Sequence, residues 1–96
     1  MLKRQPLGTR AKVTFALPIG ETPTSVSVVG DFNDWNPTAH PMKKRSNGTR
    51  SVSVELPAGA TYRFKYVSED GQWFCEPHAD GEEWNEFATT NSLLHV

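Results

Sequence analysis

Short runs in which apolar and polar residues alternate follow one another along most of this chain. Residues 12–17, 25–29, 51–56 and 61–67 alternate with a period of two, and residues 72–74 and 92–96 form two shorter runs. This period places successive side chains on opposite faces of an extended strand, whereas a helical face repeats every three to four residues. The pattern predicts an all-β protein with no helix longer than about two turns.

Gly, Pro, Asn and Asp separate the alternating runs. Ser46-Asn47-Gly48 and Asp70-Gly71 are hairpin signals, because Asn and Gly tolerate the positive φ that tight turns require. Six or seven short strands at this spacing, without helices, predict a β-sandwich, although the pattern does not give the strand order. Within residues 61–67, three aromatic residues share the predicted core face: Tyr62, Phe64 and Tyr66.

Length and composition limit the chain to one domain of an ordinary globular class. The 96 residues include 22% charged and 36% hydrophobic residues, which indicates neither disorder nor a membrane class. We expect residues 1–10, which are polar and basic, to be an N-terminal extension, and residues 11–96 to form the domain. A net charge of −1 argues against nucleic acid as the partner, and no apolar run is long enough to cross a membrane. With a single cysteine and no visible secretory signal, the expected location is cytoplasmic.

The segment 75–90 departs from the alternating pattern. It is rich in Glu, Asp, Pro and His, and it carries Trp84 and Phe87 among acidic residues. A loop of this length in a small domain is often functional. We expect a loop here, in which Trp84 either anchors the segment structurally or extends a binding surface.

Flat aromatic side chains beside hydrogen-bonding groups are what recognition of sugars requires, because a sugar has an apolar face and a rim of hydroxyls. Trp35, Trp73 and Trp84 are the candidate platforms, although tryptophans of a small sandwich also serve as core residues. Four residues are candidates to reach the hydroxyls: Arg63, Lys65, Thr89 and Asn91.

Catalytic and metal chemistry lack a convincing signature in this sequence. A glycosidase needs two carboxylates on opposing walls of a cleft, and acids at 31 and 34 or at 82 and 83 have no cleft to line in so small a sandwich. The three histidines do not share a metal-ligand spacing, and Cys75-Glu76-Pro77-His78 is a weak fragment and not a closed four-ligand site. We therefore expect no enzyme activity, no metal and no cofactor.

Five short motifs in order resemble carbohydrate-binding module family 48. Residues 28–37 contain its hydrophobic–Gly–x–Phe–Asn–x–Trp pattern, and residues 56–59 match its Leu-Pro-x-Gly turn. Its Tyr-Lys-Phe strand is similar to residues 62–67, its Asp-Gly-x-Trp hairpin to residues 70–73, and its Asn-Ser-hydrophobic closing strand to residues 91–96. That family includes the N-terminal early-set domains of isoamylases and glycogen branching enzymes, and the glycogen-binding domain of the AMP-activated protein kinase β subunit.

The resemblance implies an immunoglobulin-like (early-set) β-sandwich of about seven antiparallel strands, and it implies a site for α-glucan. In the kinase-type domains two tryptophans stack on glucose rings, and a lysine, a leucine, a threonine and an asparagine complete the site. By motif, the tryptophans correspond to Trp35 and Trp73 and the lysine to Arg63. The remaining three correspond to Asn91, Thr89 and Phe87, so that leucine is replaced by phenylalanine.

Two functions from different classes follow from this comparison. The first is non-catalytic binding of α-glucan, such as glycogen, starch or malto-oligosaccharides, by a sandwich that carries an aromatic platform. The second is a protein-interaction or accessory domain for a separate amylase- or isoamylase-type glycoside hydrolase, with little or no sugar binding of its own. Side-by-side exposure of Trp35 and Trp73 near Arg63 and Asn91 favours the first function, and burial of both rings in the core favours the second.

Overall fold

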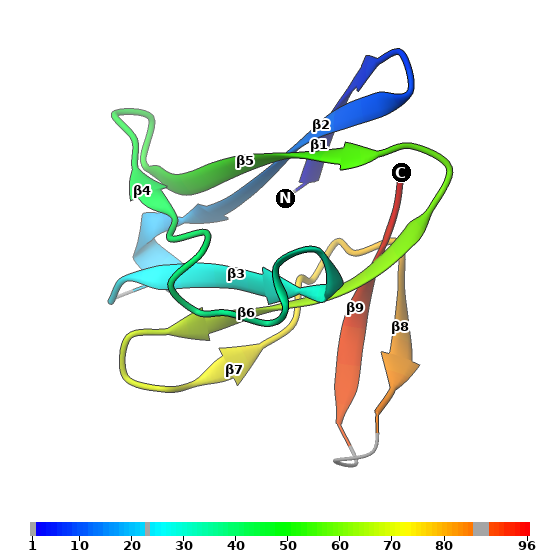
Figure 1. Cartoon of the computed structure of the whole chain (residues 1–96). Coiled ribbons are helices and arrows are strands. Elements are labelled where there is room, and N and C mark those ends of the chain that lie inside the picture. Colours follow the sequence, from blue (N-terminus) through cyan, green and yellow to red (C-terminus); the bar gives the residue numbers. More distant parts are fainter. Residues whose placement is uncertain (1, 23, 86–88) are drawn as a thin grey trace.

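The chain folds into two antiparallel sheets that pack face to face, as the computed structural model in Figure 1 shows. The structure describes residues 2–22, 24–85 and 89–96. The four-stranded sheet has the order β1 (Leu2–Leu7), β2 (Arg10–Pro18), β5 (Thr49–Pro57) and β4 (Lys43–Lys44). The five-stranded sheet has the order β3 (Val26–Gly30), β6 (Thr61–Ser68), β9 (Thr90–His95) and β8 (Gly81–Trp84), and β7 (Trp73–Phe74) also pairs with β6.

Helical structure in the described residues is limited to two single 3-10 turns, η1 (Ile19–Glu21) and η2 (Asp31–Asn33). None of the helices in these ranges is long and apolar enough to cross a membrane. The predicted all-β sandwich is therefore confirmed. The hairpin signals are confirmed as well, since Gly48 and Gly71 have φ values of 83° and 84° at the β4–β5 and β6–β7 turns.

Three strands lie outside the alternating runs of the sequence, and the shortest of them is the two-residue β4. The segment expected as an N-terminal extension contains β1, which pairs with β2 from Leu2 opposite Phe15 to Leu7 opposite Arg10. The segment 75–90, expected as a loop, contains β8. β1 and β8 lie at sheet edges and are mostly exposed, so neither needs the alternation of a strand that buries one face.

The core lies between the two sheets and is built by the alternating runs. Phe64 and Tyr66 of β6 are fully buried, and Tyr62 is partly buried against them, as the sequence predicted. The ring of Phe15 packs on Phe64 with centroids 5.2 Å apart in an edge-to-face arrangement. Because Tyr62, Phe64 and Tyr66 face inward, the side chains between them on β6 point to the outer face of the five-stranded sheet.

A buried tyrosine–glutamate pair connects β6 to the segment after β7. The Tyr66 hydroxyl donates a 2.9 Å hydrogen bond to Glu76 Oε1, and the His78 backbone N–H donates to Glu76 Oε2 at 2.8 Å. Burial by itself would raise the pKa of Glu76, but hydrogen-bond donors, including these two, outweigh it and hold that pKa below its ordinary value. Burial, together with the negative charge of Glu76, raises the pKa of Tyr66.

Glu76→Gln should lower the stability at neutral pH and flatten its acid dependence. A carboxylate whose folded pKa is lowered stabilises the fold above its unfolded pKa of about 4.3, and that contribution disappears as the pH falls through the folded value. We expect a loss of about 1–3 kcal/mol at pH 7, measured by urea unfolding from pH 7 down to about pH 3. Glu55→Gln, at an exposed position of β5, is the matched control. Equal acid dependence in the wild type and Glu76→Gln would contradict this assignment.

Candidate functional site

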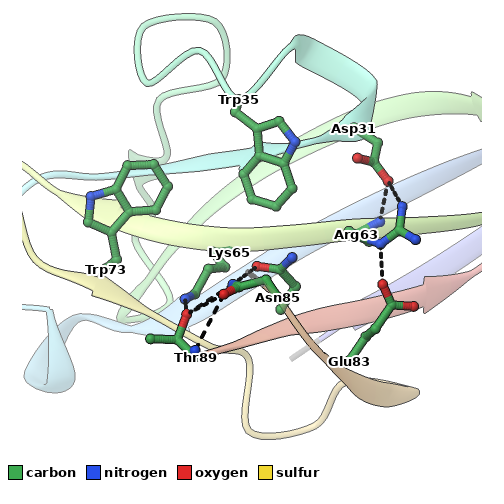
Figure 2. A pocket seen from close by; sticks show the side chains of 9 residues that line it. Asp31, Trp35, Arg63, Lys65, Trp73, Glu83, Asn85 and Thr89 are labelled. Carbon is green, nitrogen blue, oxygen red and sulfur yellow. Dashed lines mark hydrogen bonds and ion pairs between the residues drawn. The ribbon is translucent and has the colours of Figure 1, made fainter. Parts of the chain in front are cut away.

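One open pocket lies on the outer face of the five-stranded sheet (Figure 2). Its volume is about 820 Å³. It is bordered by β6, β7, β8, β9 and the turn after η2. The lining side chains are Asp31, Trp35, Arg63, Lys65, Trp73, Glu83, Asn85, Thr89 and Asn91.

Trp35 reaches the pocket from a tightly braced turn. Asn33 Oδ1 accepts a 3.0 Å hydrogen bond from the Gly30 N–H, and Asn33 Nδ2 donates to the Val28 carbonyl at 2.9 Å. The Trp35 N–H closes the turn by donating to the Gly30 carbonyl at 3.0 Å. Asp34 and Trp35 both have positive φ, 55° and 57°, which is a strained backbone for residues other than glycine. The hydrogen bonds of the turn therefore stabilise a strained backbone conformation, and this conformation directs the Trp35 ring to the pocket.

Trp73 reaches the pocket from the short strand β7. Its backbone pairs with Val67 of β6, directly after the hairpin turn at Gly71. The side chain is 50% exposed, so it is not a core residue. Figure 2 shows the Trp73 and Trp35 rings next to each other, and the same pocket is lined by Arg63 and Lys65 of β6.

Arg63 is held between two carboxylates at one end of the pocket. Its Nε donates to Glu83 Oε1 of β8 at 2.5 Å, and its Nη1 lies 3.6 Å from Asp31 Oδ2. The same Asp31 oxygen accepts the Arg63 backbone N–H at 2.9 Å. The pKa of Arg63 is raised, first by the hydrogen bond to Glu83 and then by the negative charges of Glu83 and Asp31. The guanidinium is thereby fixed in position, and both carboxylates add acceptors to the rim of the pocket.

Amide and hydroxyl groups form the opposite end of the pocket. Asn85 Nδ2 donates to Thr89 Oγ1 at 2.9 Å and to Asn91 Oδ1 at 3.1 Å. Lys65 Nζ lies 3.4 Å from the same Thr89 hydroxyl. These side chains orient one another, which leaves donors and acceptors in fixed directions along the pocket wall (Figure 2).

The structure brings six of the seven predicted site residues to this single pocket: Trp35, Arg63, Lys65, Trp73, Thr89 and Asn91. Phe87, the seventh, lies outside the described residues. Trp84 does not line the pocket, and with 73% of its surface exposed it does not anchor this segment in the core.

Three lining residues were missed as pocket residues: Asp31, Glu83 and Asn85. On sequence alone, Asp31 is weighed only as a catalytic partner of the acid at 34, and Glu83 only as a catalytic partner of the acid at 82. Glu83 and Asn85 lie two residues apart at β8, so the alternation of that strand would have placed them on one face with Asn91, had the strand been recognised.

An open aromatic platform beside fixed hydrogen-bonding groups, on the face of a small β-sandwich, is the architecture of a carbohydrate-binding module. The comparison with known families agrees. The model of carbohydrate-binding module 48 (isoamylase N-terminal domain) matches residues 8–89, and the chain belongs to that family.

Bacterial 1,4-alpha-glucan branching enzymes are among the relatives of this chain. The enzyme GlgB of Synechococcus sp. (strain CC9311) is 31% identical over 87 residues, which cover 71% of this chain and 11% of the enzyme. GlgB 2 of Xanthomonas campestris pv. campestris (strain 8004) is 44% identical over 48 residues, which cover 49% of this chain and 7% of that enzyme. The chain therefore spans about a tenth or less of the length of these relatives.

Proposed function

We propose that this protein binds α-glucan, such as glycogen, starch or malto-oligosaccharides, and performs no chemistry on it. The observation that supports this most directly is the pair of tryptophans on one open pocket. Trp73 is half exposed, Trp35 is partly exposed, and their rings lie side by side (Figure 2) in a pocket that Arg63 and Asn91 also line. Two hydrophobic rings are kept out of the core, which is costly unless a ligand with an apolar face covers them.

Consecutive glucose rings of the glucan would stack on Trp35 and Trp73. The hydroxyls at the ring edges would then meet Arg63 and its two carboxylates at one end, and the group formed by Lys65 and Thr89 at the other. Because the lining side chains already hydrogen-bond to one another, little ordering is required when the sugar binds.

The arrangement of the pocket carboxylates supports binding rather than hydrolysis. A glycosidase holds its acid and its base or nucleophile on either side of the scissile bond. Here Asp31 and Glu83 both contact the guanidinium of Arg63, which lies between them. We propose that any chemistry on the glucan is done by a separate glucan-metabolising enzyme to which this module delivers or anchors the polymer.

Co-sedimentation with glycogen tests this function. Purified protein should pellet with glycogen in an ultracentrifuge, and soluble maltoheptaose or β-cyclodextrin should return it to the supernatant. Cellobiose, whose β-linkage gives a straight chain, is the negative control. A protein that stays in the supernatant at all glycogen concentrations would refute glucan binding.

Arg63→Ala should weaken maltoheptaose binding less than loss of either tryptophan. The guanidinium is exposed, and its hydrogen bond to a sugar hydroxyl replaces one to water. We expect about a twofold to threefold increase in Kd by titration calorimetry. Glu83→Gln is the control, because it keeps the shape of the Glu83 side chain but removes the charge that holds Arg63. It changes the position of the Arg63 guanidinium without removing its donors. A tenfold or greater loss in Arg63→Ala would contradict an aromatic platform as the main source of affinity.

A further inference from the structure

Trp84 is an exposed aromatic side chain that the pocket does not use. At 73% exposure it is more exposed than Trp73 and Leu7, the other large hydrophobic residues at the surface of the described ranges. It is the last residue of β8, and Figure 1 shows this end of β8 directed away from the four-stranded sheet. The second layer of the sandwich therefore does not cover it.

The ring of Trp84 lies on the other face of β8 from the pocket. Its neighbours in the chain, Glu83 and Asn85, both line the pocket. Side chains alternate between the two faces of a strand, so Trp84 points to the opposite face. Its cross-strand partner is Thr90 of β9, whereas Glu83 pairs with Asn91, the partner on the pocket side.

The two faces meet at a free sheet edge. β8 is the edge strand of the five-stranded sheet and, in the described residues, pairs only with β9. Such an edge carries backbone N–H and C=O groups without strand partners, which are donors and acceptors for hydroxyls. The exposed carboxylates of Glu82 and Glu83 disfavour pairing with a strand of another protein, as charged residues do at sheet edges.

We infer that the bound α-glucan chain continues from the pocket over the β8 edge and stacks on Trp84. This rests on the proposed function, because the first glucose rings must occupy the pocket. An α-1,4-linked chain curves, since each linkage turns the next ring relative to the one before, and it can follow a bend around a single strand. Trp84 is thus a subsite for long chains that gives preference for polymer over short oligosaccharide.

Chain-length dependence of binding tests the inference. Wild type, Trp84→Ala and Trp84→Phe are titrated calorimetrically with maltotetraose, which is short enough for the pocket alone, and with maltodecaose. We expect Trp84→Ala to leave the Kd for maltotetraose unchanged and to raise that for maltodecaose about threefold to tenfold. Trp84→Phe, which keeps an aromatic ring, should recover part of the loss. Trp73→Ala, as the matched control, should weaken both ligands.

Each other outcome overturns the Trp84 subsite. Maltodecaose binding that is equal in wild type and Trp84→Ala, or equal losses for both ligands, would remove it while leaving the pocket in place. Sedimentation velocity that shows a dimer in wild type and a monomer in Trp84→Ala would assign the ring to self-association instead. If wild type binds neither ligand, the proposed function fails, and the subsite fails with it.

Discussion

Trp73→Ala will raise the Kd for maltoheptaose about tenfold or more while the protein stays folded. A half-exposed tryptophan that stacks on a glucose ring should contribute about 1–3 kcal/mol, as aromatic anchors do at other recognition surfaces. The fold should tolerate the change, because the side chain lies outside the core and the pairing of β7 with β6 uses the backbone. Titration calorimetry gives the affinity, and tryptophan fluorescence gives a second measurement.

Two further variants make this result specific to the ring. Trp73→Phe should retain part of the affinity, since a smaller aromatic face remains. Leu7→Ala removes another exposed hydrophobic residue, from β1 outside the pocket, and should bind like wild type. Trp35→Ala should weaken binding to a similar extent, and thermal unfolding must accompany it because Trp35 belongs to the strained turn. Wild-type affinity in folded Trp73→Ala would contradict the platform.

Gly30→Ala will lower the stability of the fold. A Cβ atom at this position would lie 2.4 Å from the Arg63 carbonyl oxygen and 2.9 Å from the Phe64 Cβ. Neither atom belongs to a flexible side-chain end, so β3 and β6 must move apart. We expect a loss of about 1–3 kcal/mol or more, equivalent to a fall in Tm of roughly 10 °C for a domain of this size. Because the turn that carries Trp35 hydrogen-bonds to Gly30, glucan affinity should fall too.

Gly20→Ala is the matched control for this prediction. Gly20 lies in η1, and a Cβ there would have no heavy atom within 4 Å. Its thermal unfolding should follow that of wild type. If Gly30→Ala unfolds at the same temperature as Gly20→Ala, the close approach of β3 to β6 at Gly30 is not a determinant of stability.

Strands that bury one face were predictable from the sequence, whereas the exposed edge strands β1 and β8 were not. The alternation in β2, β5 and β6 exists because the inner face must be apolar, and that requirement is visible without a structure. β1 and β8 bury almost nothing and carry no such pattern. The burial of the Glu76 carboxylate could not be predicted, for a related reason. A buried carboxylate is predictable only when its donors are known, and Tyr66 is brought to it by tertiary pairing.

The position of the pocket and four of its polar side chains could be predicted from the sequence, but three other polar side chains could not. Trp35 follows a recognisable turn, and Trp73 follows a recognisable hairpin. Asp31, Glu83 and Asn85 enter the pocket through contacts between elements that are distant in the sequence. The ion pair of Arg63 with Glu83 joins β6 to β8, and the position of β8 beside β9 followed from no pattern along the chain.

Titration of the wild-type protein with maltoheptaose tests the central claim most directly. An isolated pocket that engages few glucose rings should bind with a Kd between roughly micromolar and millimolar, because association entropy offsets much of the stacking energy. We therefore predict a saturable heat of binding in this range, accompanied by a change in tryptophan fluorescence. Absence of both signals at millimolar maltoheptaose, with the protein folded, would contradict glucan binding and leave the accessory-domain function in its place.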